Sequence, residues 1–166
     1  MIRNNLLILV TCLAIFASAE DQGDWVDTYD LPIPFVPKPF FAGYLNITSD
    51  KAYYYVYYAS EKNPSKDPLI VRISGGPGCS SLYSFLYSKG PFIFTPNTTE
   101  FRVNPFNWNK EANILFIEGP AGVGFAHGDA SNMTDSRFAE ENILALLKFY
   151  EKFPERKNQD VYLSGA

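Results

Sequence analysis

A glycine-rich stretch at residues 74–81, Ser-Gly-Gly-Pro-Gly-Cys-Ser-Ser, constrains the fold of this chain more than any other feature. It follows an apolar run at residues 69–71, which predicts a buried strand. Three glycines and a proline in so short a run exclude a helix or a regular strand and predict a tight turn. Because glycine lacks a Cβ, its N–H can approach a ligand oxygen, and N–H groups of this kind stabilise the oxyanion in acyl transfer.

The overall composition predicts one globular unit. The chain has 166 residues, of which 46% are hydrophobic, and no stretch has the composition of a disordered segment. The formal net charge is −4, which argues against nucleic acid as a partner. We see no internal repeat and no sign of a second domain.

The first 19 residues predict a secretory signal peptide. Arg3 provides a basic start, residues 6–16 are apolar, and residues 17–19 read Ala-Ser-Ala, which is typical of a cleavage site. The apolar run is shorter than the roughly 20 residues needed to span a bilayer, and no later segment is a candidate span. We therefore expect a mature chain of residues 20–166 in the secretory pathway, without a membrane anchor.

The positions of cysteine and of certain asparagines also bear on the predicted secretory route. Cys12 lies in the signal peptide, so Cys79 is the one cysteine left in the mature chain. An odd cysteine in a secreted chain indicates a disulfide partner elsewhere or a free thiol, and a small buried residue behind the glycine turn is the alternative. Glycosylation is expected at one or more of three sequons, of which the second is the best candidate: Asn46, Asn97 and Asn132.

Five segments predict strands. They are residues 41–47, 52–59, 69–73, 114–117 and 161–164. The first two flank a polar turn at residues 48–51 and predict a hairpin, with Asn46 on its outer face. The tyrosines of the second segment are interpreted as sheet packing rather than as a binding platform. The fourth segment is apolar throughout, as expected of a central parallel strand.

Two segments predict helices. Residues 80–87 predict one short helix, which Gly90 and Pro91 end. For the second helix, Thr134 is a suitable N-cap and Pro154 closes the run. Its apolar positions recur at helical spacing: Ala139, Ile143, Leu146, Leu147 and Tyr150. The fourth strand, this helix and the last strand together predict a right-handed parallel crossover.

A second block of sequence makes the glycine-rich turn specific. Residues 104–109 read Asn-Pro-Phe-Asn-Trp-Asn, and residues 112–125 read Ala-Asn-Ile-Leu-Phe-Ile-Glu-Gly-Pro-Ala-Gly-Val-Gly-Phe. In this order, and with residues 74–81, they resemble the serine carboxypeptidase family, which comprises secreted or vacuolar peptidases of the α/β-hydrolase fold. Weaker similarity extends over residues 29–165. The resemblance implies that residues 20–166 are the N-terminal part of an α/β-hydrolase sheet with crossover helices, truncated before the nucleophile elbow.

The catalytic triad of that family has no match in this sequence. An α/β-hydrolase carries its nucleophile in a Gly-x-Ser-x-Gly elbow, followed by an acid and a histidine, and no such elbow occurs here. The family elbow reads Gly-Glu-Ser-Tyr; Gly165 matches its glycine, and Ala166 stands at the glutamate. The sole histidine, His127, is interpreted as a surface loop residue. The residues given are therefore predicted not to catalyse.

The resemblance also implies roles for residues near the glycine turn. Gly76 would donate its N–H to the oxyanion, and Gly75 would set the turn. Arg72 stands where the family has a tryptophan. In the family, the cysteine equivalent to Cys79 is bonded to one far downstream, which this sequence does not hold. Three positions that contact the C-terminal carboxylate of a peptide substrate in the family are altered: Ser74, Ser88 and Ala166.

No cofactor and no metal are expected. The pair Gly122 and Gly124 superficially resembles a dinucleotide fingerprint, but Gly128 is one position late and Pro120 interrupts the pattern. The sequence also holds neither a phosphate loop nor a metal-ligand cluster.

Three functional hypotheses follow. In the first, the chain is a serine carboxypeptidase acting on peptide C-termini in an extracellular, vacuolar or lysosomal compartment, seen as a fragment, a truncated gene product or a short isoform. In the second, it is a secreted, non-catalytic binding protein of carboxypeptidase-like fold. In the third, it does not fold stably, because a partial sheet leaves an unpaired strand edge that favours a partner or aggregation.

Overall fold

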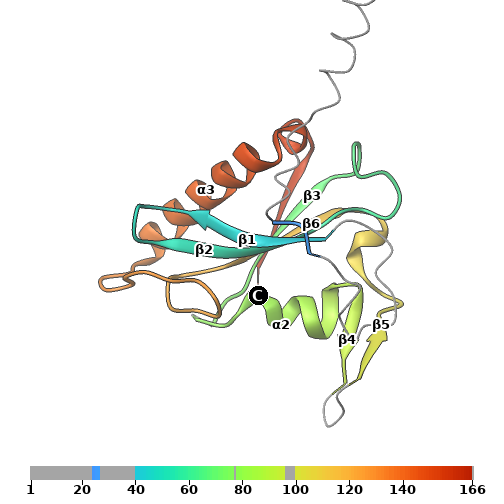
Figure 1. The fold of residues 1–166 in the computed structure, drawn as a ribbon, viewed down its shortest axis with the longest axis horizontal. Helices are drawn as coiled ribbons and strands as arrows, with labels where there is room; N and C mark the ends of the chain where they lie inside the picture. Colours follow the sequence, from blue (N-terminus) through green and yellow to red (C-terminus); the bar gives the residue numbers. More distant parts are fainter. Residues whose placement is uncertain (1–23, 27–39, 77, 96–99, 166) are drawn as a thin grey trace, which may run out of the picture.

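The computed structural model describes residues 24–26, 40–76, 78–95 and 100–165. The signal-peptide prediction at residues 1–19, the sequon at Asn97 and the position of Ala166 lie outside these residues. Figure 1 shows one sheet between two layers, with helix α3 (Asp135–Lys152) on one face and helix α2 (Ser81–Ser84) on the other. This layered α/β arrangement confirms the predicted fold class.

Five strands form the main sheet, in the spatial order β1-β2-β6-β3-β7. Their bounds are Phe40–Asn46 (β1), Ala52–Tyr58 (β2), Leu69–Ile73 (β3), Asn113–Glu118 (β6) and Val161–Ser164 (β7). The five predicted strands and the hairpin of β1 and β2 are therefore confirmed. The strand β6 is central and buried along its whole length, and it pairs parallel with β3. The prediction of a central parallel strand is confirmed by this pairing, and on its other side β6 pairs antiparallel with β2.

The sheet carries a hydrophobic core on each face, because successive side chains of a strand point to opposite sides. The core on the α3 side includes Tyr53, Tyr55, Tyr57, Leu115, Ile117, Ala145 and Phe149. The core on the α2 side includes Val56, Tyr58, Phe85, Phe92, Ile114 and Phe116. Alternate tyrosines of β2 thus enter one core while the residues between them enter or border the other. The interpretation of these tyrosines as sheet packing is confirmed.

The segment between β3 and β6 differs from the prediction. In place of one helix over residues 80–87, the short helix α2 passes into a π-helical turn, η2 (Phe85–Lys89), which ends at Gly90. An antiparallel hairpin follows, formed by β4 (Phe92–Phe94) and β5 (Phe101–Val103). Sequence analysis missed it, because strands of 3 residues are too short for an alternating pattern to stand out. Two 3₁₀ turns are η3 (Trp108–Lys110) and η4 (Pro154–Arg156).

Helix α3 begins where its N-cap is predicted, and Thr134 Oγ1 accepts a hydrogen bond from the backbone N of Arg137 at 3.2 Å. Its buried face is narrower than the apolar periodicity implies. Phe149 is fully buried, but Ile143 is 60% exposed and Leu147 is 50% exposed. These two residues stay exposed because α3 packs over β1 and β2 and leaves its flank near β7 uncovered.

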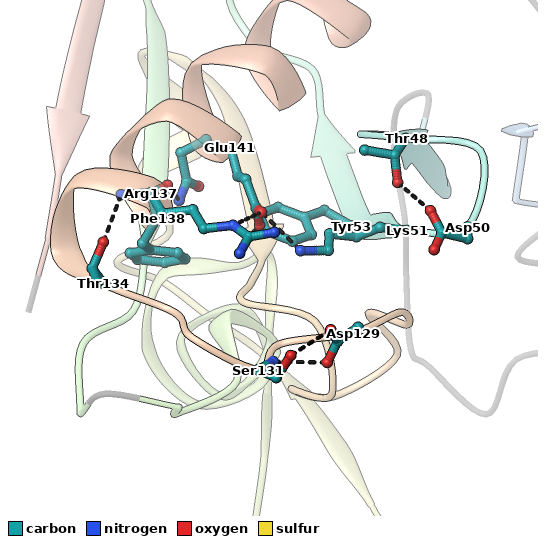
Figure 2. A network of polar contacts seen from close by, with 11 residues as sticks. Thr48, Asp50, Lys51, Tyr53, Asp129, Ser131, Thr134, Arg137, Phe138 and Glu141 are labelled. Atoms are coloured by element: carbon teal, nitrogen blue, oxygen red, sulfur yellow. Dashed lines mark hydrogen bonds and ion pairs between the residues drawn. The ribbon is translucent and has the colours of Figure 1, made fainter.

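A buried polar network fixes α3 against the start of β2 (Figure 2). The Glu141 carboxylate accepts hydrogen bonds from Lys51 Nζ at 2.8 Å, from the Tyr53 hydroxyl at 2.5 Å and from Arg137 Nε at 3.2 Å. Burial opposes ionisation of Glu141, but the hydrogen bonds from Lys51 and Tyr53 outweigh it and hold its pKa below the ordinary value. Burial and the Glu141 contact raise the pKa of Tyr53, which therefore stays a donor.

We predict that Glu141→Gln lowers the free energy of unfolding at pH 7 by roughly 3–5 kcal/mol, because the buried Lys51 ammonium then loses its anionic partner. The pKa of Glu141 is lowered on folding, so its stabilising contribution is present above the unfolded value of about 4.3 and disappears as the pH falls through the folded value. Urea unfolding from pH 7 to pH 3 measures this, and the difference between wild type and variant should shrink in acid.

The matched control is Glu151→Gln, which removes an exposed ion pair with Lys148. Such a pair contributes about 0–1 kcal/mol, so this variant should unfold close to wild type. Equal stability of the two variants at pH 7 would contradict a structural role for the network.

Candidate functional site

The two sequence blocks singled out above meet at one edge of the sheet. The glycine-rich turn at residues 74–81 follows β3, and a second loop at residues 119–126 follows β6. Because β3 and β6 are parallel neighbours, their carboxyl ends lie side by side. Crevices at the carboxyl ends of parallel strands are the usual place for ligands in sheets of this kind.

Backbone geometry of the turn requires glycine at residue 76. Gly76 has a φ of 132°, which side-chain-bearing residues rarely adopt. A Cβ at this position would also lie 2.9 Å from the Cys79 sulfur. The turn is closed by a hydrogen bond of 3.1 Å from Cys79 N to Gly75 O. Within the described residues, the N–H groups of Gly75 and Gly76 meet no hydrogen-bond acceptor, so both are available to a ligand.

Ser81 ties the turn to the central strand. Its hydroxyl donates to the carbonyl oxygen of Ile117 in β6 at 2.6 Å and accepts from the backbone N of Ser74 at 3.1 Å. The first and last residues of the turn are therefore held by one side chain, which is itself buried. Position 76 is thereby fixed relative to β6.

Glu118, at the end of β6, joins the two loops. Its carboxylate is fully buried and accepts hydrogen bonds from the Ser80 hydroxyl and from the backbone N of Phe125, the latter at 2.8 Å. A Cβ on Gly124 would overlap the carboxylate, so the second loop approaches it as closely as a glycine allows. Sequence analysis did not assign Glu118 a role; an acid closing an otherwise apolar strand is the signal that would have found it.

Two hollows flank the glycine turn and share Ser74, Gly75 and Gly76. The Arg72 hollow, of about 610 Å³, is lined by Arg72, Tyr83, Ser84 and Ser88 together with the turn. The Met133 hollow, of about 550 Å³, is lined by Pro120, Met133, Asp135 and Phe138 together with the turn. The turn thus lies between one hollow that holds Arg72 and several serine hydroxyls and another that holds Asp135, Met133 and Phe138.

Two of the three positions predicted as altered carboxylate contacts, Ser74 and Ser88, lie in the described residues, and Ser74 lines both hollows. Ser88 lines the Arg72 hollow, and its exposed side chain donates to the carbonyl oxygen of Ser84 at 3.3 Å. Cys79 is exposed and free, so the alternative of a small buried residue behind the turn is wrong. Its disulfide prediction stays a prediction.

The other predicted positions lie on loops and strand ends. Asn46 and Asn132 are exposed, as a glycan acceptor requires, and Asn132 has a φ of 61°. His127 is exposed, which confirms a surface loop histidine; its backbone pairs with Ala52 and its ring lies 5.2 Å from that of Tyr44. Among the described residues, no three His, Cys, Asp or Glu side chains gather as metal ligands. No described helix has the length and apolar character of a membrane span.

Comparison with a solved structure shows the fold, and the family match shows the class of protein. The chain superposes with a TM-score of 0.71 on a prohormone-processing carboxypeptidase from Saccharomyces cerevisiae, over 87% of this chain and 35% of that one, at 22% identity. The shared fold is that of the α/β hydrolases. Residues 32–166 match the serine carboxypeptidase family, and the chain belongs to this family.

Curated relatives agree with that assignment. The lysosomal protective protein of Mus musculus is 36% identical over 163 residues, which cover 95% of this chain and 34% of the relative. The serine carboxypeptidase ctsa-4.1 of Caenorhabditis elegans is 41% identical over 165 residues, which cover 97% of this chain and 35% of the relative. The chain thus spans about a third of the length of the curated relatives it matches.

We predict that Glu118→Gln lowers the free energy of unfolding by about 1.5–3 kcal/mol, because a buried, charge-assisted acceptor for two part-buried donors becomes a neutral amide. The backbone N–H of Phe125 should also exchange with solvent faster than in wild type. Urea unfolding and amide hydrogen exchange measure the two effects.

Glu111→Gln is the control, since Glu111 is exposed and pairs with the exposed Lys62. It should leave both measurements near the wild-type values. An unchanged exchange rate at Phe125 in Glu118→Gln would show that the carboxylate does not hold the second loop.

Proposed function

We propose that this chain provides the oxyanion-binding and substrate-holding part of a serine carboxypeptidase site, and that residues 1–166 alone do not hydrolyse peptides. The observation that carries the proposal is the glycine turn, whose first residue, Ser74, is tied to β6 through Ser81 and whose Gly75 and Gly76 N–H groups meet no acceptor among the described residues. In this proposal Gly76 donates its N–H to the oxyanion and Gly75 sets the turn. Residues 20–166 form the carboxypeptidase-like domain.

Inactivity follows from the residue types that acyl transfer requires. In the family the second oxyanion donor is the N–H of the residue after the nucleophile, and the printed sequence has no elbow serine to precede it. Loss of one oxyanion donor raises a barrier by about 2.7–4 kcal/mol. Loss of the nucleophile and its base has a larger effect, because it removes the covalent pathway itself.

The substrate class proposed is the C-terminus of a peptide. The substituted contact positions Ser74 and Ser88 line the Arg72 hollow beside the turn, and Ala166 is the third such position. A serine hydroxyl donates one hydrogen bond, whereas the carboxyl–carboxylate pairing of the family needs an acid. The chain therefore holds a peptide terminus through other groups, or less tightly.

The proposed route is secretory. A signal peptide at residues 1–19 would direct the chain to the extracellular space or to a lysosomal or vacuolar compartment. Exposure of Asn46 and Asn132 supports their use as glycan acceptors, with Asn97 as a third proposed site. Cys79 is proposed as a disulfide residue, because its thiol is exposed.

A non-catalytic binding protein is the second candidate function, and one observation favours it. β7 is an edge strand of the main sheet, and its apolar residues Val161, Tyr162 and Leu163 are 41%, 58% and 75% exposed. An exposed apolar edge strand is a template for pairing with another chain. A partner at this edge would cover it.

The inactivity proposal predicts that the purified chain releases no amino acid from an N-blocked dipeptide and is not labelled by a serine-directed fluorophosphonate. The reason is that no serine of the sequence lies in a Gly-x-Ser-x-Gly elbow with a base that would activate it. Heat-denatured chain sets the background, and a complete serine carboxypeptidase run in parallel shows that both assays work. Labelling of any serine above background, or amino acid release, would overturn the proposal.

The edge proposal predicts that the purified chain self-associates and that Leu163→Lys reduces this association, because a charge on the edge strand disfavours strand pairing. Sedimentation velocity over a concentration series measures it. Phe106→Lys is the control, since Phe106 is 82% exposed and lies outside the sheet edge. If both variants associate like wild type, the edge is not the contact surface.

A further inference from the structure

A buried cation with no anionic partner among the described residues lies beside the glycine turn. Arg72 of β3 is only 8% exposed. Its guanidinium donates from Nε and Nη2 to the Ser84 hydroxyl, at 3.4 and 3.3 Å, and from Nη1 to the Ser164 hydroxyl, at 3.3 Å. Among the described residues, no carboxylate oxygen lies within 4.0 Å of it.

This arrangement is unusual for a buried charge. Arginine is almost never buried unless it is paired, because removing the charge from water is costly. The hydroxyl contacts of Arg72 are long for hydrogen bonds and engage neutral groups only. A guanidinium has five N–H donors in a planar fork, so the two serines leave part of its capacity unused.

The surroundings of Arg72 favour a carboxylate as the missing partner. Arg72 lines the hollow that also contains Ser74, Ser84, Ser88 and Gly76, and no acidic side chain lines it. The forked guanidinium matches a carboxylate in two parallel hydrogen bonds. The hollow on the far side of the turn instead contains Asp135, which disfavours an anion there.

We propose that Arg72 is the binding residue for the C-terminal carboxylate of a bound peptide, a proposal that rests on the proposed function of this site. The last residue of the peptide occupies the Arg72 hollow, and the residue before it occupies the Met133 hollow. The carbonyl that joins them then lies over Gly76. Arg72 thus compensates the charge of the peptide terminus, because the contact positions Ser74 and Ser88 carry no acid side chain.

The test compares an N-blocked dipeptide with a free C-terminal carboxylate, the same dipeptide as its C-terminal amide, and acetate alone. Binding to the purified full chain is measured by calorimetry. We expect the acid to bind about 10-fold or more tightly than the amide, because charge-assisted hydrogen bonds are the stronger ones. Acetate should bind far more weakly than the acid dipeptide, since it does not fill the second hollow.

Variants assign the preference to Arg72. Arg72→Gln should abolish the preference for the acid while leaving amide affinity unchanged, and Arg72→Lys should keep part of it, because lysine retains the charge without the fork. Measured at pH 7.5, where an exposed glutamate is ionised and cannot form the carboxyl–carboxylate pair of the family, Ser88→Glu places a negative charge at the exposed rim without changing the core, and should weaken acid binding even if Arg72→Gln fails to fold. Arg102→Gln, at an exposed position of β5, is the matched control and should bind like wild type.

The outcomes separate the two proposals. If the acid dipeptide binds and Arg72→Gln and Ser88→Glu keep its preference, the role of Arg72 is overturned while the peptide cleft stands. If Arg72→Gln only lowers stability, Arg72 is a cross-link between β7 and α2. If acetate competes as well as the acid dipeptide, the site is a carboxylate site without a peptide cleft. If neither dipeptide binds, the proposed function itself is overturned.

Discussion

The site depends on the hydrogen bonds that the buried Glu118 carboxylate accepts from two loops. A buried carboxylate is tolerated only where donors satisfy it, and here the donors come from two different loops, through the Ser80 hydroxyl and the Phe125 backbone. Each loop is therefore held where its donor reaches Glu118. Because β6 is buried on both faces, it provides a rigid reference for both loops, and the Ser81 contact to Ile117 O adds a second anchor. The position of the glycine turn follows from these contacts.

Two other buried charged residues show that the hydrogen-bond partners of a charge decide whether it serves stability or binding. Glu141 lies within reach of Lys51, Tyr53 and Arg137, so its charge is compensated inside the protein and its effect is on stability. Arg72 is buried to a similar extent, yet within the part of the chain that the structure describes its guanidinium donates only to hydroxyls. The first arrangement is complete without a ligand. The second leaves part of the donor capacity of the guanidinium unused in a residue that lines a hollow, which is the pattern expected of a binding residue.

Sequence analysis predicted most of the fold because its strands are long apolar or alternating runs. It failed for features that a local sequence pattern does not encode. The hairpin of β4 and β5 has strands too short to carry a pattern, and the exposure of Ile143 and Leu147 depends on how much of the sheet α3 covers. At the site, the glycine turn could be found from residue types alone, whereas the role of Glu118 depends on donors more than five positions away in sequence. The exposure of Cys79 likewise follows from the path of the turn.

The charges on the two sides of the turn also give a bound peptide a direction. With its carboxylate at Arg72, the terminus faces a cation and several hydroxyls, and the preceding residue meets the apolar surface of Met133 and Phe138. In the reversed direction the carboxylate would lie beside Asp135, with two like charges close together. The glycine turn lies between the hollows, so only the first direction brings the last peptide bond to the Gly76 N–H with its terminal charge compensated. In the proposed binding mode, the charges of Arg72 and Asp135 therefore favour a C-terminal residue in the Arg72 hollow.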